Sequence, residues 1–281
     1  MMWIDSHCHL SYPGLAENLS EVLTSAAAAG VGRMITIGTD LPDHDKAVEI
    51  AARNPAVFLA LGIHPHHAAE VEPDYEAFLE KRLTTHPKAV GLGECGLDYH
   101  YDFSPKLLQK GVFLNQLEIA RKCHLPVILH IREAHEDGLA ILKDFPELRH
   151  KCVVHCFTGT PAECAAWLDW GAYIGITGIV TYKNADDVRA DAKLVPADRL
   201  LVETDAPYLS PEPVRNIKTN TPAHVVHTGR YLAQLRGVAE EELARQTTAN
   251  AAALFGEKIL GGGVLGSKRV CEKKSFPNRA R

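Results

Sequence analysis

The chain of 281 residues carries a formal net charge of −5, so it offers no broad basic surface of the kind that nucleic-acid-binding proteins normally show. No stretch approaches the roughly 18 consecutive apolar residues of a membrane span, and we expect neither membrane association nor a secretory signal. The seven cysteines form no CxxC pair, which argues against a disulfide framework. We therefore expect a cytoplasmic protein, with the nucleus as the alternative, and no obligate protein partner.

Short apolar runs alternate with polar turns and helical stretches along the chain. Eight runs are expected to form strands, at residues 2–4, 34–37, 57–61, 89–92, 127–129, 152–154, 172–176 and 200–202. Apolar residues recur at helical spacing between them, for example at 15–29, 44–52, 75–83 and 107–123. Strands that alternate with helices predict a parallel sheet. Eight such units within about 250 residues favour an α/β fold of the (β/α)8 TIM-barrel type over an open doubly wound sheet.

We assign residues 1–258 to one barrel domain, because no proline-rich or serine-rich linker divides this part of the chain. The composition changes after Phe255. Three consecutive glycines at 261–263 precede a stretch with few apolar residues and several basic ones: Lys268, Arg269, Lys273, Lys274, Arg279 and Arg281. Such a stretch predicts a disordered, solvated basic tail over residues 259–281. An arm that attracts phosphate or directs the protein to a compartment is the alternative interpretation.

The polar residues with the strongest chemical signal lie at the C-terminal ends of the expected strands. His7 and His9 are two residues apart, so on a strand both imidazoles face the same side. Alone, each candidate also has a structural interpretation: an HxH pair is often part of a core, and Glu94 could form a salt bridge inside the barrel. The parallel strands of a barrel bring these ends together at one mouth. The expected metal ligands are therefore His7, His9, Glu94, His130, His155 and Asp205.

Four histidines and two carboxylates suffice to hold two divalent cations with a bridging hydroxide. This mixed set suits Zn²⁺, Mn²⁺ or Mg²⁺, although two histidines per cation argue against a site for Mg²⁺ alone. Glu203, two residues before Asp205, offers a further acid that could support a ligand or contact the substrate.

Three more residues are candidate substrate contacts. His64 ends the third strand, where it could bind an anionic substrate, bind a metal or be structural. Arg132, two residues beyond His130, could present its guanidinium to a phosphate or carboxylate, and Arg215 follows the last strand in the same way. Structural salt bridges are the alternative for both arginines. Three cysteines next to candidate ligands are expected to be packing thiols that face the helices rather than nucleophiles: Cys8, Cys95 and Cys156.

Together these residues resemble the TatD-like metal-dependent hydrolases, usually described as TatD deoxyribonucleases, within the amidohydrolase-type barrels. The resemblance runs from Ile4 to about Phe255. It rests on seven motifs in order: D-x-H-x-H at 5–9, G-x-H-P-H at 62–66, G-E-x-G-L-D-Y at 93–99, Q-x-x-x-F-x-x-Q at 109–116, H-x-R-x-A at 130–134, H-C-F-x-G at 155–159 and E-T-D-x-P-x-L at 203–209. In this family an arginine–asparagine pair follows the last strand. Arg215 and Asn216 match it, whereas residues 217–222 depart from the usual R-N-x-P run.

The resemblance implies a TIM barrel in which Glu94 bridges two divalent metals held by the six ligands. It also implies Mg²⁺- or Mn²⁺-stimulated DNase activity, with 3′-to-5′ exonuclease action on single strands in some members. We therefore predict a phosphodiester hydrolase that acts on single-stranded DNA through two-metal activation of water, with Glu94 and Asp205 as catalytic residues.

Two alternatives stay open. The same barrel and ligands could hydrolyse a small amide, a lactone or an aminoacyl ester, because a metal hydroxide attacks carbonyl carbon as readily as phosphorus. Related amidohydrolases often carry a carboxylated lysine on the fourth strand. Glu94 stands at that place here, which favours the nuclease-like branch. The second alternative is a non-catalytic metal-binding or scaffold protein. A degenerate protein of this kind should have lost a ligand, and none of the six candidate ligands is missing.

Overall fold

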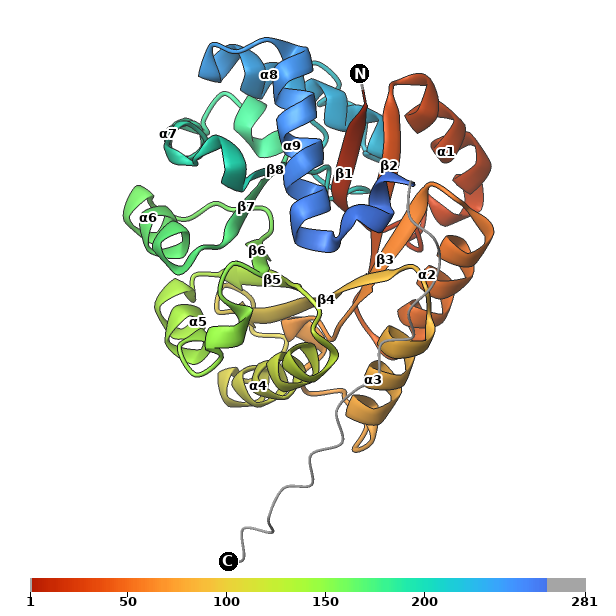
Figure 1. Cartoon of the computed structure of the whole chain (residues 1–281), viewed down its shortest axis with the longest axis vertical. Helices are drawn as coiled ribbons and strands as arrows, with labels where there is room; N and C mark the ends of the chain where they lie inside the picture. The colour runs from red at the N-terminus through yellow and green to blue at the C-terminus, as the bar shows by residue number, and fades with distance from the viewer. Residues whose placement is uncertain (1, 262–281) are drawn as a thin grey trace, which may run out of the picture.

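The computed structural model describes residues 2–261, and within them eight parallel strands form a barrel surrounded by helices (Figure 1). Neighbouring strands pair in chain order from β1 to β8, which is the arrangement of a (β/α)8 barrel. The strands are β1 (Trp3–Cys8), β2 (Val31–Gly38), β3 (Val57–Leu61), β4 (Ala89–Asp98), β5 (Val127–Arg132), β6 (Cys152–Val154), β7 (Tyr173–Ile176) and β8 (Leu200–Val202). The TIM-barrel prediction is confirmed.

One α-helix follows each of the first seven strands, and two follow β8. They are α1 (Leu19–Ala28), α2 (Leu41–Arg53), α3 (Tyr75–Thr85), α4 (Lys106–Cys123), α5 (His135–Leu142), α6 (Pro161–Trp170), α7 (Asp186–Leu194), α8 (Val225–Arg236) and α9 (Glu240–Phe255). Within residues 2–261 no helix is long and apolar enough to cross a membrane.

The expected tail begins in the described part of the chain and ends outside it. A 3-10 helix spans Glu257–Leu260, and its Ile259 is fully buried against the barrel. Ile259 therefore packs with the domain and adds its side chain to the apolar core. The remainder of the expected tail, residues 262–281, lies outside the described residues.

Apolar side chains pack in two layers, one inside the barrel and one between the strands and the helices. On β5, Ile128 belongs to the inner cluster, whereas Val127 and Leu129 belong to the outer one. This is the alternation that a strand with a period of two residues produces. Helix α9 lies across one end of the barrel (Figure 1), and its Phe255 joins the inner cluster. The interior is thus closed at that end, and polar chemistry is confined to the other end.

Two strands depart from regular alternation at the residues expected to bind metal. On β1, Ile4 belongs to the inner cluster, so strict alternation would turn His7 outward, but the pairing with β2 shifts between Asp5 and Cys8. On β4, the pairing with β5 shifts between Leu92 and Cys95. Such irregularities re-aim side chains. They place His7 and Glu94 on the inner face of the barrel.

Several candidate ligands lie inside strands rather than after them. The strand expected at 89–92 continues to Asp98, and the one expected at 127–129 continues to Arg132. A glycine makes the longer pairing possible: Gly96 has φ +144°, and a Cβ there would lie 2.1 Å from the carbonyl oxygen of His130. Only glycine allows the two strands to approach so closely at this point.

A buried side-chain contact reinforces the seam between β1 and the segment after β8. Asp5 is fully buried; its Oδ1 accepts a hydrogen bond from the Thr204 amide at 2.9 Å, and its Oδ2 lies 2.6 Å from the Thr204 hydroxyl. The same hydroxyl accepts from the Ala206 amide at 3.1 Å. Burial raises the pKa of Asp5 to about 8. The seam orders the chain segments that carry three of the candidate ligands.

Replacing Thr204 by valine should destabilise the barrel. The change leaves one Asp5 oxygen and the Ala206 amide without a partner, at a cost of about 1–3 kcal/mol for each unsatisfied group. The free energy of unfolding from urea titration measures the loss. Thr228→Val is the matched control, because Thr228 is equally buried and its hydroxyl has no hydrogen-bond partner within residues 2–261. An equal loss in both variants would contradict a specific role for the seam.

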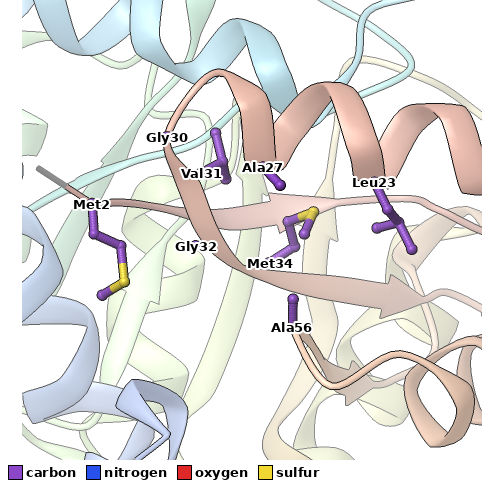
Figure 2. A pocket seen from close by; sticks show the side chains of 8 residues that line it. All are labelled: Met2, Leu23, Ala27, Gly30, Val31, Gly32, Met34 and Ala56. Atoms are coloured by element: carbon purple, nitrogen blue, oxygen red, sulfur yellow. The ribbon is translucent and has the colours of Figure 1, made fainter.

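A cavity of about 300 Å³ lies near the start of β2, at the N-terminal ends of the strands (Figure 2). Apolar side chains and glycine line it: Met2, Leu23, Ala27, Gly30, Val31, Gly32, Met34 and Ala56. This lining offers no group that could bind a cation or an anion. The candidate ligands lie at the opposite, C-terminal ends of the strands.

Candidate metal centre

Ligand atoms from β1 and the residue after it, from β4 and from the segment after β8 form a first group. The Nε2 atoms of His7 and His9 are 3.3 Å apart, and Oε2 of Glu94 lies 3.3 Å from the former and 3.9 Å from the latter. Oδ1 of Asp205 lies 3.3 Å from His9 Nε2 and 3.6 Å from His7 Nε2. All four side chains thus point to one spot.

A second group forms around the other oxygen of Glu94. Oε1 lies 2.7 Å from Nδ1 of His130 and 2.8 Å from Nε2 of His155, and these two nitrogens are 3.4 Å apart. Glu94 therefore turns one oxygen toward each group. The structure brings together all six residues that the sequence marked as ligands.

The donor set of both groups fits a cation. His7, His9 and Glu94 place ligand atoms within 4.8 Å of one another, and so do Glu94, His130 and His155. A neutral imidazole has one nitrogen without a proton, and converging unprotonated nitrogens and carboxylate oxygens need a positive charge between them. Imidazole with carboxylate is a donor set that Zn²⁺ and Mn²⁺ accept readily. The described residues could hold a divalent metal in either group.

Burial and charge act against each other on these side chains. Burial by itself would raise the pKa of Glu94, but the facing imidazoles, His155 foremost, hold it well below its usual range. Burial likewise opposes ionisation of Asp205, and its contact with His9 lowers its pKa overall. Burial is the main cause that lowers the pKa of His7. Both carboxylates are therefore ionised at neutral pH, and His7 is neutral. Burial opposes protonation of His9, His130 and His155, but the facing carboxylates raise the pKa of all three, so a bound cation would have to displace their protons.

Two acids outside the groups orient the histidines of the second one. Oδ2 of Asp98 lies 2.9 Å from Nε2 of His130, and Oε1 of Glu203 lies 3.5 Å from Nδ1 of His155. Glu203 also accepts a hydrogen bond from the Ser6 hydroxyl at 3.1 Å. A carboxylate behind a ligating histidine fixes the ring and raises its basicity. Glu203 faces His155 at ion-pair distance, which fits one of the two roles considered for it, that of supporting a ligand.

Asp98 was not singled out from the sequence. It is fully buried, and its hydrogen bonds with His130 and His66 outweigh burial and lower the pKa of its carboxyl group far below the usual range. The sequence signal that could have identified it is spacing: Asp98 follows Glu94 by four residues, and side chains four apart on one strand share a face. An extension of β4 to this residue would have placed it beside β5.

The three expected substrate contacts occupy different surroundings. His64 lies close to the second group, with its Nε2 at 3.5 Å from Oε1 of Glu94 and its ring 4.4 Å from that of His130. The guanidinium of Arg132 lies 4.8 Å from the ring centre of Tyr101. The guanidinium of Arg215 lies 3.6 Å from the ring centre of Tyr182. Neither arginine forms an ion pair within the described chain.

The three cysteines beside candidate ligands differ in their packing. Cys8 and Cys95 are fully buried in the outer layer, as expected, and burial raises the pKa of both thiols well above the usual value. Cys156 is partly exposed to solvent, and its sulfur lies 3.5 Å from the Thr177 hydroxyl. Burial also raises its pKa, to about 12. A thiol with so high a pKa is a poor nucleophile at neutral pH.

Glu94→Gln should weaken metal binding in both groups at once, because the amide presents a neutral carbonyl oxygen to one group and an NH2 group, which cannot bind a cation, to the other. We expect the Kd for Mn²⁺ or Zn²⁺ to rise by at least about tenfold, since even loss of a residue behind the ligands has an effect of that size. Isothermal titration and metal analysis of the dialysed protein measure it. Glu49→Gln, an exposed carboxylate on α2, is the control. Unchanged stoichiometry and affinity in Glu94→Gln would count against the centre.

Known proteins match nearly the whole described chain in sequence. Residues 4–256 match the family model described as TatD related DNase. The chain is 39% identical to the uncharacterized metal-dependent hydrolase YabD of Bacillus subtilis, over 90% of this chain and 99% of that protein. It is 40% identical to the 3′-5′ ssDNA/RNA exonuclease TatD of Erwinia tasmaniensis, over 89% of this chain and 98% of that protein.

The solved structures agree with the sequence comparison. The TatD homologue YJJV of Escherichia coli superposes with a TM-score of 0.86 at 30% identity, over 90% of this chain and 97% of that chain. An organophosphorus hydrolase from Deinococcus radiodurans superposes with a TM-score of 0.64 at 17% identity, which shows a common fold alone. The chain belongs to the TatD related DNase family of metal-dependent hydrolases.

Proposed function

We propose that this hydrolase cleaves phosphodiester bonds in single-stranded DNA, as a 3′-to-5′ exonuclease with two divalent cations. The observation that carries the proposal is the position of Glu94, which presents one oxygen to each of two ligand groups. The relative from Erwinia tasmaniensis, named as an exonuclease on single strands, supports the substrate class.

The first cation would be held by His7, His9 and Asp205, and the second by His130 and His155, with Glu94 shared. Bound divalent cations lower the pKa of water and neutralise charge on phosphoryl oxygens. We expect Mn²⁺, Mg²⁺ or Zn²⁺ to support activity, since the donor set mixes imidazole and carboxylate.

The two catalytic carboxylates differ in what they are free to do. The Glu94 side chain is 4% exposed and both its oxygens face histidines, so it is suited to hold the centre together. The Asp205 side chain is 15% exposed, and its Oδ1 is the atom that faces the first group. Asp205 is therefore the better candidate to orient the attacking water and accept its proton, and its lowered pKa keeps it ionised for that role.

Binding of the substrate phosphates is assigned to three side chains. Arg132 and Arg215 each present a guanidinium that forms no ion pair within residues 2–261, and a planar guanidinium can bind a phosphate through two parallel hydrogen bonds. His64 lies beside Glu94 at the second group, where it would contact a phosphate oxygen at the centre. These assignments account for affinity at the site itself, which an acidic chain cannot obtain from a broad basic surface.

The experiment is an assay of the wild type and Asp205→Asn on end-labelled single-stranded DNA, with Mn²⁺, Mg²⁺, Zn²⁺ and EDTA as separate arms. We expect shortening from the 3′ end by the wild type with metal, no turnover with EDTA, and a fall in kcat of about 100-fold or more in the variant. Metal analysis of both proteins separates loss of chemistry from loss of cation. Double-stranded DNA, RNA and a panel of amides, lactones and aminoacyl esters complete the arms. Cleavage of the panel without cleavage of DNA would overturn the proposal.

A further inference from the structure

The loop between β4 and α4 presents two aromatic rings to solvent beside the metal centre. Phe103 is 65% exposed and Tyr101 is 42% exposed. Their ring centres are 5.4 Å apart and their planes differ by 24°, so the two rings stack. Single exposed apolar residues are common on protein surfaces and need no explanation. Two exposed rings that stack on each other beside a candidate catalytic centre are not such single residues, and they call for an explanation.

Two histidine rings connect this pair to the centre. The ring of His66 lies 4.8 Å from that of Phe103 and 5.5 Å from that of Tyr101. His66 in turn lies 4.3 Å from the ring of His64, whose Nε2 is 3.5 Å from Oε1 of Glu94. The aromatic pair is therefore connected to the second ligand group through the rings of His66 and His64.

The loop is fixed in place although its aromatic rings are exposed. Oδ1 of Asp98 accepts hydrogen bonds from the amides of His100 and Tyr101, each at 3.0 Å. The Ser104 hydroxyl donates to the carbonyl of His66 at 2.7 Å, and the Gln109 amide group donates to the carbonyls of Ser104 and Asp98. A binding surface held in advance loses little conformational freedom when a ligand arrives.

The same loop lies beside a cationic group. The guanidinium of Arg132 is 4.8 Å from the ring centre of Tyr101, at the end of β5. An arginine at this distance from an aromatic ring is attracted by the ring and keeps its own donors available. The surface thus combines flat aromatic faces with a group that can bind phosphate, which are the two elements found in sites for single-stranded nucleic acid.

We propose that Tyr101 and Phe103 form a stacking platform for a nucleobase of the substrate strand, with Arg132 on the adjoining phosphate. The inference rests on the proposed nuclease function and names how the strand is gripped. Stacking requires no hydrogen bond to the base edge, so the platform accepts every base. It also provides affinity that does not depend on net charge, which suits a chain with a net charge of −5.

The test compares two substrates and four proteins. The substrates are a single-stranded oligonucleotide and the same oligonucleotide with abasic residues at its 3′ end. The proteins are the wild type, Phe103→Ala, Phe103→Trp and the control Phe78→Ala, whose ring is 46% exposed on α3 outside the barrel. Because Phe103 is largely exposed, its replacement leaves the core untouched. Steady-state KM and kcat are measured with Mn²⁺ present.

On the intact strand we expect Phe103→Ala to raise KM about tenfold or more, with kcat changed by less, and Phe103→Trp to restore the wild-type value. On the abasic strand the wild type should show the raised KM, and Phe103→Ala should add nothing further. Phe78→Ala should match the wild type on both. An equal rise in KM for Phe103→Ala on the two substrates would assign the effect to structure and overturn the platform.

The failures of the two proposals are distinguishable. If the wild type cleaves the intact strand but Phe103→Ala leaves KM unchanged, the platform fails and the nuclease function stands. If the wild type cleaves neither strand with any of the three metals, the nuclease function fails and the nucleobase platform fails with it.

Discussion

The carboxylate of Glu94 is ionised and only 4% exposed, so both of its oxygens need a polar or charged partner. An unpaired buried charge is very costly. Glu94 meets this demand with nitrogen on each side: His7 faces Oε2, while His130 and His155 face Oε1. The surrounding chain provides this environment. The pairing shifts on β1 and β4 turn the side chains inward, and α9 closes the far end of the barrel with apolar residues. The polar end can therefore hold this much charge without weakening the apolar interior.

Much of this could be predicted from the sequence because the relevant signals are local. A short apolar run followed by a histidine or a carboxylate marks the end of a strand, and eight such runs define a barrel whose strand ends share one mouth. His130 and His155 were found in this way. The six candidate ligands follow from their positions at the ends of the expected strands, and the structure places them within reach of one another.

Other features depend on contacts that no local pattern reports. The strands were expected to end where their apolar runs end, but β4 continues through Glu94 to Asp98 because Gly96 lets it approach β5. Asp98 was missed for that reason. Asp5 appeared only as part of a motif, and its partner Thr204 is 199 residues away. His64 was expected at the substrate, and only the packing shows that it also lies against Glu94. Long-range pairing of this kind arises because the barrel brings the first and last strands next to each other.

The two oxygens of Asp98 serve different parts of the protein. One orients His130 at the metal centre, and the other holds the amides of His100 and Tyr101 in the loop. A substitution that shifts this loop would therefore also alter the basicity of a candidate ligand, and a change at the ligand would be transmitted to the loop. In this protein the loop after β4 is therefore not an independent module. A new substrate preference introduced there would have to be selected together with a retuned affinity for metal.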